Sequence, residues 1–484
     1  MKTVSKHFGL GKSQAELDFL DIVLNKDNRL YLDPFALSIQ PDRWSVDAHL
    51  TLVSYFDSVV IAIREGRHDD AKELLTNLNE PNETRLGQSR GKPKGAGIGD
   101  DQADDIYEAL KKSGAVKTGV LSSLQECELF IPGIGWDKIS DLTTNVIRKH
   151  LADYTTAQCD LHDIPFENVA LSPYYDTDLQ NWVSAEFEVP VVNGLPLLLV
   201  PRSIVRRAPA YDHGKFYTHF VLTTLQVQHL NAGSSLVRSI KNKKKRTVTK
   251  RVYKKDLREH YPSSKDALAD FIRKNPEVLK AYRERLVSSA DSVRDESKEF
   301  EIVDEVVVAE SLRDALKSIP KGSADATRYH RLMIGILEFL FFPNLGHPKK
   351  EKEIHEGRKR IDILIENCAT SGIFHRLHSI RKIPCAFVPV ECKNYTTDVA
   401  NPELDQISGR FSPNLGKVGF VCCRAFEDRS LFVKRCVDTF KDDRGLICPL
   451  DDKTIDLLLS EIANGHREKV DHRLTELVDE VWVS

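Results

Sequence analysis

The nine-residue stretch FVPVECKNY, at residues 387–395, limits the fold of this chain more than any other feature. Its apolar residues are typical of a buried strand, yet it carries Glu391 and Lys393. Side chains alternate along a strand, so these two charges share one face, while Val390 and Cys392 share the other. Burying an ion costs several kcal/mol unless the ion is paired, hydrogen-bonded or metal-bound. The stretch therefore predicts a strand with a core face and a polar face that serves some chemistry.

The last 160 or so residues alternate between strand and helix patterns. The expected order is helix 328–342, strand pair 353–367, strand 386–395, helix 401–411, strand 417–423, helix 430–440, strand 446–450 and two closing helices. Strands that alternate with helices indicate an α/β domain with a mixed, partly parallel sheet flanked by helices.

The preceding part of the chain divides into three expected segments, which make the whole chain α+β. Residues 1–165 form a helical N-terminal region, residues 166–260 a strand-rich region that ends in a basic segment, and residues 261–320 a helical connector. Within the second segment, Asn193-Gly194 between two apolar runs predicts a hairpin. The α/β domain then occupies residues 321–484.

The polar face of the 387–395 strand has a neighbour of the same kind. In RIDILIEN the three isoleucines share the core face, which leaves Asp362 on the polar face. If the two strands pair, Asp362 approaches Glu391, and two adjacent carboxylates repel unless a cation lies between them. Oxygen ligands suit Mg²⁺ or Mn²⁺. A lysine at Lys393 could then hold or deprotonate an attacking water, or neutralise charge on a phosphate, so the pattern predicts phosphodiester hydrolysis.

With Glu338 on the preceding helix and Gln406 on the following one, this arrangement resembles the PD-(D/E)xK nuclease superfamily, which includes restriction endonucleases and Holliday-junction resolvases. The resemblance covers residues 325–459. It implies a catalytic set of Asp362, Glu391, Lys393, Glu338 and Gln406. It implies metal ligands from Asp362, Glu391, Glu338 and the backbone carbonyl of Cys392. The residues between the two strands, NCATSGIFHRLHSIRKIPC, are expected to extend a hairpin loop beside the site.

Structural alternatives remain open for each of these residues. Alternating charges also occur on exposed strands, and a single acid such as Glu338 on an apolar helix can be paired with an arginine. Gln406 and Arg410 also have the spacing of an exposed i, i+4 pair.

A nucleic-acid partner requires a local basic surface, because the net charge of the chain is -3. Eleven Lys and Arg residues lie between residues 238 and 258, although such a run can also be a solvated segment. The expected DNA-binding residues are Lys243, Lys244, Lys245, Arg246, Lys250, Arg251, Arg358, Arg360 and Arg410. IPGIG, at residues 131–135, resembles the turn of a helix-hairpin-helix motif; the alternative is a tight interhelical turn capped by Asp137.

Several classes of protein are disfavoured by simple features of the chain. The FGLGKS stretch at residues 8–13 lacks the first glycine of a phosphate loop and follows no strand, so no ATP motor is expected. No apolar run is long enough to predict a membrane span, and the first residues lack the pattern of a secretory signal. Nine cysteines without a CxxC pair indicate reduced thiols and a cytoplasmic protein.

The expected function is Mg²⁺-dependent endonucleolytic cleavage of DNA, with a role in defence against foreign DNA by analogy to restriction enzymes. A homodimer would suit cleavage of both strands, and a partner subunit could supply ATP hydrolysis or regulation. The alternatives are an exonuclease or RNase of the same fold, or an adaptor that binds nucleic acid through an inactive nuclease fold.

Overall fold

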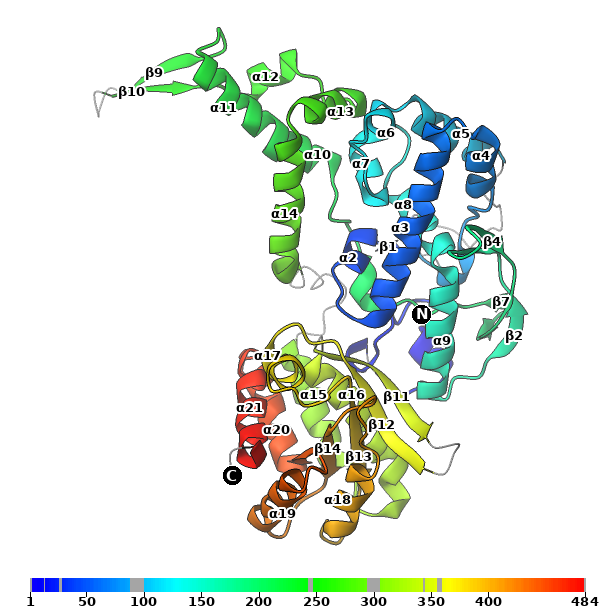
Figure 1. The fold of residues 1–484 in the computed structure, drawn as a ribbon, viewed down its shortest axis with the longest axis vertical. Helices are drawn as coiled ribbons and strands as arrows, with labels where there is room; N and C mark the ends of the chain where they lie inside the picture. Colours follow the sequence, from blue (N-terminus) through cyan, green and yellow to red (C-terminus); the bar gives the residue numbers. More distant parts are fainter. Residues whose placement is uncertain are drawn as a thin grey trace.

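The computed structural model describes residues 2–12, 14–25, 28–87, 100–242, 247–293, 305–342, 344–354 and 359–482. These residues form two lobes stacked along the long axis of the molecule, each with its own hydrophobic core (Figure 1). The core of the upper lobe extends along the chain from Val4 to Tyr282, and that of the lower lobe from Val308 to Val481 with the addition of Leu161. One core in the upper lobe therefore includes residues from all three segments that the sequence separates before residue 321.

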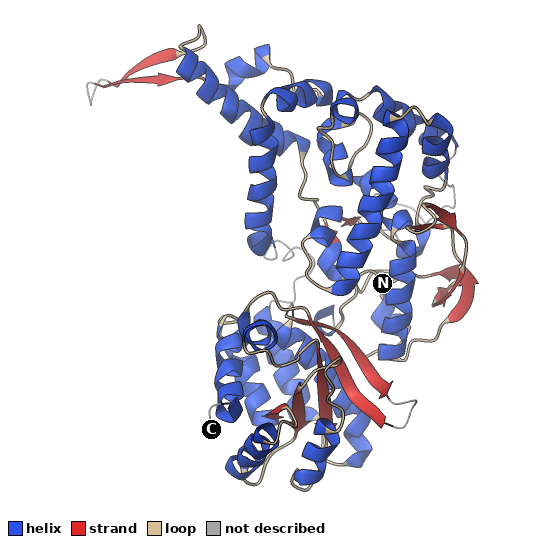
Figure 2. Ribbon diagram, in the orientation of Figure 1, coloured by secondary structure: helices blue, strands red, loops and turns tan. Residues whose placement is uncertain are grey.

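The upper lobe is mainly helical (Figure 2). Its first helices are α1 (Val4–His7), α2 (Pro34–Ser38), α3 (Arg43–Arg64), α4 (His68–Thr76), α5 (Asp100–Lys112), α6 (Gly114–Thr118), α7 (Cys127–Phe130), α8 (Trp136–Val146) and α9 (Arg148–His162). α3 begins where the Asp42 side chain accepts a hydrogen bond from the Ser45 N–H at 2.8 Å, which satisfies a free amide of the first turn. Leu52, Tyr55 and Val59 then recur at helical spacing and are buried.

Short strand pairs lie mostly within residues 166–260, where strands are predicted, although β1 lies earlier and residues 213–232 and 254–260 of that segment are helical. The antiparallel pairs are β1 (Tyr31–Leu32) with β8 (Val205–Arg206), β2 (Glu167–Ala170) with β5 (Glu186–Val189), β3 (Tyr174–Asp176) with β4 (Asn181–Val183), and β6 (Val191–Val192) with β7 (Leu195–Pro196). Asn193 and Gly194, with φ of 54° and 77°, form the turn between β6 and β7. This confirms the predicted hairpin, because a two-residue turn of this kind needs positive φ at both positions.

A second helical group completes the upper lobe. It consists of α10 (His213–Phe216), α11 (Leu222–Ala232), α12 (Lys254–His260), α13 (Lys265–Lys274) and α14 (Pro276–Val293), with a π-helical turn at Tyr217–Val221. Between α11 and α12 the chain forms an antiparallel hairpin of β9 (Arg238–Asn242) and β10 (Thr247–Arg251). This hairpin, called the basic hairpin below, projects away from both lobes (Figure 1).

The lower lobe is built on a five-stranded mixed sheet. The strand order is β11 (Leu345–Ile354), β12 (Lys359–Asn367), β13 (Phe387–Lys393), β14 (Val418–Cys423) and β15 (Leu446–Asp451). β11, β12 and β13 are antiparallel neighbours, whereas β13, β14 and β15 run parallel. The helices are α15 (Glu305–Ser318), α16 (Ala326–Phe341), α17 (Gly372–His375), α18 (Asn401–Ser408), α19 (Arg429–Lys441), α20 (Asp452–Ala463) and α21 (Lys469–Trp482). The predicted mixed sheet flanked by helices is confirmed.

The segment between β12 and β13 differs from the expected loop. It forms α17 and a π-helical turn at Arg376–Ile380, and it is held against α21. The Ile373 N–H donates to Asp471 at 2.8 Å, and Arg381 bonds Asp479 at 2.9 Å. These bonds tie the segment to the end of the chain.

Helices cover the two faces of the sheet, and the alternation of β13 decides which residues each face receives. On one face, Phe420 of β14 stacks on Phe341 of α16, with ring centroids 5.5 Å apart. On the other face, α18 lies so close that a Cβ at Gly419 would be 2.8 Å from Ile407 and 2.8 Å from the Pro389 carbonyl oxygen. A glycine is therefore required for α18 to approach the sheet beside β13.

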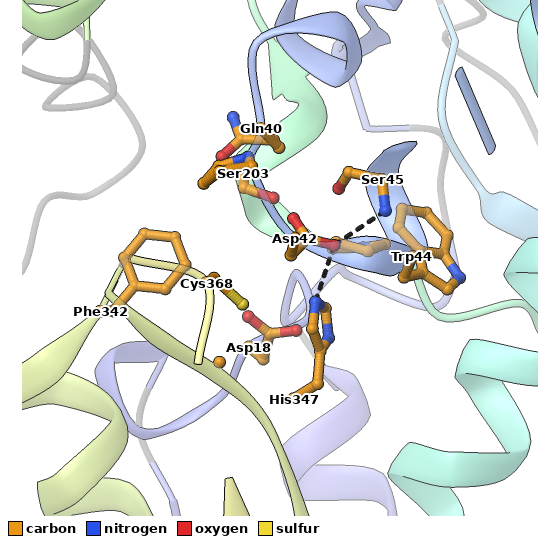
Figure 3. A pocket seen from close by; sticks show the side chains of 12 residues that line it. Asp18, Gln40, Asp42, Trp44, Ser45, Ser203, Phe342, His347 and Cys368 are labelled. Atoms are coloured by element: carbon orange, nitrogen blue, oxygen red, sulfur yellow. Dashed lines mark hydrogen bonds and ion pairs between the residues drawn. The ribbon is translucent and has the colours of Figure 1, made fainter. Parts of the chain in front are cut away.

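Polar contacts join the lobes around a small cavity (Figure 3). His347 of β11 lies 2.8 Å from Asp42, at the start of α3, and Asp18 lines the same cavity. Burial lowers the pKa of His347, but the hydrogen bond and charge of Asp42 outweigh burial and raise that pKa to about 9. The pair is therefore ionic at neutral pH and bridges the two cores.

Within the described residues, α3 alone has the length and composition of a membrane-spanning helix. Half of its most apolar window is buried inside the upper lobe. One face of α3 thus contributes to the upper core.

Candidate active site

The register between β12 and β13 brings the predicted acids together. Ile363 pairs with Val390 and Leu364 with Pro389, so the next position in this antiparallel register sets Asp362 opposite Glu391. The carboxylate of Asp362 accepts a hydrogen bond from the Cys392 N–H at 3.0 Å. A backbone amide of one strand thus fixes the side chain of the other.

Glu391 has no exposed surface, although it is ionisable. Lys393 Nζ lies 3.3 Å from Glu391 Oε2, and Arg410 Nη1 contacts Glu391 Oε1. Both carboxylate oxygens lack a hydrogen bond of good geometry from the described residues, so only the two cations compensate them. A buried carboxylate satisfied by charge alone is costly, and such arrangements gather at functional sites.

α18 supplies the polar partners on this face of the sheet. The helix begins at Asn401 with Pro402 in its first turn, and the Glu403 side chain accepts from the Ala400 N–H at 2.9 Å. Three residues after Glu403, Gln406 Oε1 accepts a hydrogen bond from Lys393 Nζ at 3.0 Å. The lysine is thereby held between an amide oxygen and a carboxylate, with 11% of its side chain exposed.

The residues present fit a hard divalent cation. Asp362 and Glu391 offer carboxylate oxygens on adjacent strands, and those of Glu391 accept no hydrogen bond from the described part of the chain. In the described ranges no group of three or more His, Cys, Asp or Glu side chains could hold an ion. Two carboxylates with the Cys392 carbonyl and water are nevertheless the donor set that Mg²⁺ accepts, since it keeps several waters.

Glu338 is not brought to this site, contrary to the expectation that it completes the metal site. It is buried on α16, and the charges that act on it are those of Asp18, Arg202, Lys12 and His347. Burial and then the Asp18 carboxylate raise the pKa of Glu338 to about 8. Its neighbours belong mainly to the other lobe, so its role is at the junction between the lobes.

The expected DNA-binding residues separate into three groups. Lys243 to Arg246 and Arg358 lie outside the described residues, as does the side chain of Arg360 on β12. Lys250 and Arg251 are exposed on β10 of the basic hairpin. Arg410 is 8% exposed and belongs to the site, where it pairs with Glu391.

The IPGIG turn joins α7 to α8, and Gly135, not Asp137, is the cap residue of α8. Lys265 Nζ donates to the carbonyl oxygens of Ile131 at 3.0 Å and Ile134 at 2.8 Å. A lysine from α13 thus stabilises this turn from within the protein.

Two polar residues beside the site were not predicted. His330 Nε2 of α16 lies 3.0 Å from the Asp362 carbonyl oxygen. Asn394, next to Lys393, donates to the carbonyl oxygens of Pro320 at 3.0 Å and Gly322 at 2.8 Å, and it accepts from Arg424. These bonds anchor the end of β13. Asn394 could have been found from its position directly after the ECK residues. His330 could have been found because it is a polar residue on a helix that is otherwise largely apolar.

The fold and the site define a two-lobed α+β protein whose lower lobe gathers two acids, a lysine and an arginine on a mixed sheet. Residues 9–212 match the model of a family described as a domain of unknown function (DUF8370). This match covers less than half of the chain and ends within the upper lobe. No curated protein and no solved structure matches the chain.

Proposed function

We propose that this chain is a Mg²⁺-dependent nuclease that hydrolyses phosphodiester bonds within DNA strands. The observation that carries the proposal is the cluster on β13. Glu391 is fully buried between Lys393 and Arg410, and Asp362 is fixed one strand away. Adjacent acids with a lysine beside them have the composition of a metal-assisted hydrolytic site.

Each residue has a role that its contacts support. Asp362, Glu391 and the Cys392 carbonyl would hold Mg²⁺, which when bound polarises a phosphate oxygen and lowers the pKa of water. Lys393 Nζ orients the attacking water and donates to the charge that develops on the phosphate oxygens. Gln406, by accepting from Lys393 Nζ at 3.0 Å, holds the ammonium group beside Glu391.

The basic hairpin supports a nucleic-acid substrate. It projects from the body (Figure 1). Lys250 and Arg251 of β10 are exposed. Lysine and arginine that neutralise phosphates release counterions, which gives affinity without reading the base sequence. In a chain of net charge -3, such a local surface is needed to attract DNA.

The biological setting is part of the same proposal. The resemblance to restriction-type nucleases favours a cytoplasmic enzyme of defence against foreign DNA. Cleavage of both strands would be served by a homodimer, and a partner subunit could supply ATP hydrolysis or regulation.

The test is a panel of substrates. The purified protein is incubated with supercoiled plasmid, linear duplex, single-stranded DNA and RNA, with Mg²⁺ and with EDTA. We expect Mg²⁺-dependent nicking or linearisation of the plasmid that EDTA abolishes. Attack on linear ends alone would instead identify an exonuclease, cleavage of RNA alone an RNase, and binding without cleavage an adaptor.

The matched variants are Asp362→Asn and Glu366→Gln. Both residues lie on β12 and alternate to the same face, but Glu366 pairs with Phe387 at the far end of the register. Each change removes one carboxylate charge. Asp362→Asn should be inactive, whereas Glu366→Gln should cleave like the wild type.

A further inference from the structure

Arg410 is a cation that contacts a carboxylate proposed to bind a divalent metal, a position where a second positive charge is unexpected. It follows the C-terminal end of α18, is 8% exposed, and its guanidinium contacts Oε1 of the fully buried Glu391. The negative charge of Asp362 also acts on it. One buried arginine therefore faces both acids that would bind Mg²⁺.

A guanidinium and a divalent cation cannot share these carboxylates at full strength. Both are positive, and in a poorly hydrated site their repulsion is large. In the metal-free protein, however, Glu391 needs a positive partner, because leaving a buried charge unpaired costs several kcal/mol. Arg410, together with Lys393, provides that charge.

We infer that Arg410 is an exchangeable counter-cation: divalent metal displaces its guanidinium from Glu391, and the released guanidinium binds a phosphate of the substrate. This inference rests on the proposed function and deepens it. Guanidinium suits phosphate because it forms two parallel, charge-assisted hydrogen bonds. In this exchange Glu391 would bind the metal in place of Arg410, and Arg410 would bind the phosphate in place of Glu391.

A thermodynamic consequence follows from the exchange. Metal binding frees Arg410 for phosphate, and phosphate binding frees Glu391 for metal, so each should raise the affinity for the other by the same factor. Coupling between two sites in proteins is typically about 5- to 150-fold. A fixed structural ion pair between Arg410 and Glu391 would add nothing to the coupling that a direct contact between metal and phosphate already gives.

The experiment measures Mn²⁺ affinity by electron paramagnetic resonance in full-length protein carrying Lys393→Met, which prevents cleavage. Affinity is compared with and without a short DNA duplex. With Arg410 intact, the duplex should tighten Mn²⁺ binding by about fivefold or more. With Arg410→Gln, Mn²⁺ should bind about fivefold or more tightly without DNA, because its competitor is gone. The duplex should then tighten Mn²⁺ binding by a smaller factor than it does with Arg410 intact, because only the direct contact between phosphate and metal remains.

Arg444→Gln is the matched control. Arg444 also binds α18, donating to Asp405 at 2.6 Å and Ser408 at 2.8 Å, but it is paired away from Glu391. This variant should behave like the protein with Arg410 intact. If Arg410→Gln fails to fold without metal, Arg410→Lys replaces it, and this variant should bind Mn²⁺ more tightly than the protein with Arg410 intact.

Two results would overturn the inference, and they differ in what else they affect. Equal Mn²⁺ affinity and equal DNA dependence in all variants would mean that Arg410 is a fixed structural partner, and would leave the proposed nuclease intact. Absence of Mn²⁺ binding in every variant, and in the protein with Lys393 restored, would remove the metal site and with it the proposed function.

Discussion

At the scale of single residues, two buried glutamates of the lower lobe differ in the charge of the groups around them. Glu391 contacts Lys393 and Arg410 and faces Asp362, whereas Glu338 is influenced first by burial and then by the Asp18 carboxylate. Both are almost fully buried, so exposure alone does not separate them. Their neighbours do, since cations favour the ionised carboxylate and acids or burial disfavour it.

We predict that Glu338→Gln leaves cleavage at the wild-type rate and changes the pH dependence of stability. The pKa of Glu338 is about 8 in the fold against an ordinary value of 4.5, so the folded protein binds this proton more tightly. Wild-type stability should therefore fall as pH rises from about 4.5 through 8. The variant lacks this loss, so its melting temperature should exceed that of the wild type at pH 9 and match it at pH 4.

Thermal unfolding of both proteins across this pH range checks the prediction, with Glu259→Gln, an exposed residue of α12, as the control. A loss of Mg²⁺-dependent cleavage in Glu338→Gln would contradict it and return Glu338 to the catalytic set.

The placement of side chains on strand faces could be predicted where the determining contacts are local. The faces of β12 and β13 follow from alternation, which is why Asp362, Glu391 and Lys393 could be grouped before the fold was known. Glu338 could not be placed in this way. Almost every residue of α16 after Met333 is buried, so periodicity leaves its facing open, and the groups around Glu338 come from distant parts of the chain.

At the scale of secondary-structure elements, the strand and helix order of the lower lobe was predictable because its signals are short-range. The Asn193-Gly194 turn and the start of α18 were likewise readable from a few residues. The packing of α17 on α21 was not, because the partners of Ile373 and Arg381 lie about a hundred residues away. Tertiary contacts of this kind override local propensity.

The basic hairpin is the element whose contribution to binding can be measured most simply. If Lys250 and Arg251 each neutralise one DNA phosphate, replacing both with alanine should lower the log-log salt slope of duplex binding by about 1.8. Affinity should fall similarly for unrelated sequences, because phosphate contacts do not read bases.

Fluorescence anisotropy with two unrelated duplexes over a series of salt concentrations measures this slope. The control removes the exposed Lys434 of α19 and Lys469 of α21, which lie on the other lobe. An unchanged slope in Lys250→Ala/Arg251→Ala, or an equal change in the control, would mean that the hairpin does not contact DNA.

At the scale of the whole molecule, the two cores are joined by charged contacts as well as by apolar packing. Asp163, at the end of α9, contacts Arg331 and lies 3.3 Å from Lys350, and Asp42 pairs with His347. Leu161 of α9 packs into the lower core. The part of the chain that matches a known family and the part that carries the candidate site are thus physically coupled.

We predict that His347→Gln destabilises the protein below pH 7, and that this effect disappears at high pH. The pKa of His347 is raised to about 9 from 6.5, so its charged form is favoured in the fold. That contribution is complete below about 6.5 and is lost as pH rises through 9. The shift corresponds to about 3 kcal/mol at most.

Chemical unfolding at pH 6 and at pH 10 measures the difference, with the exposed His466→Gln as the control. A destabilisation of equal size at both pH values would show that His347 acts through packing and not through its charge.

The central claim is that Asp362, Glu391 and Lys393 act as one catalytic unit, and plasmid cleavage in Mg²⁺ tests it most directly. The rate of nicking is measured for the wild type, Asp362→Asn, Lys393→Met, their double variant and Glu366→Gln, each shown to be folded by its melting curve. We predict that each single variant loses at least about 10²- to 10³-fold in rate. Because residues that act as a unit are not additive, the double variant should be little worse than either one. Cleavage by Lys393→Met at the wild-type rate, with EDTA still inhibiting, would contradict the account.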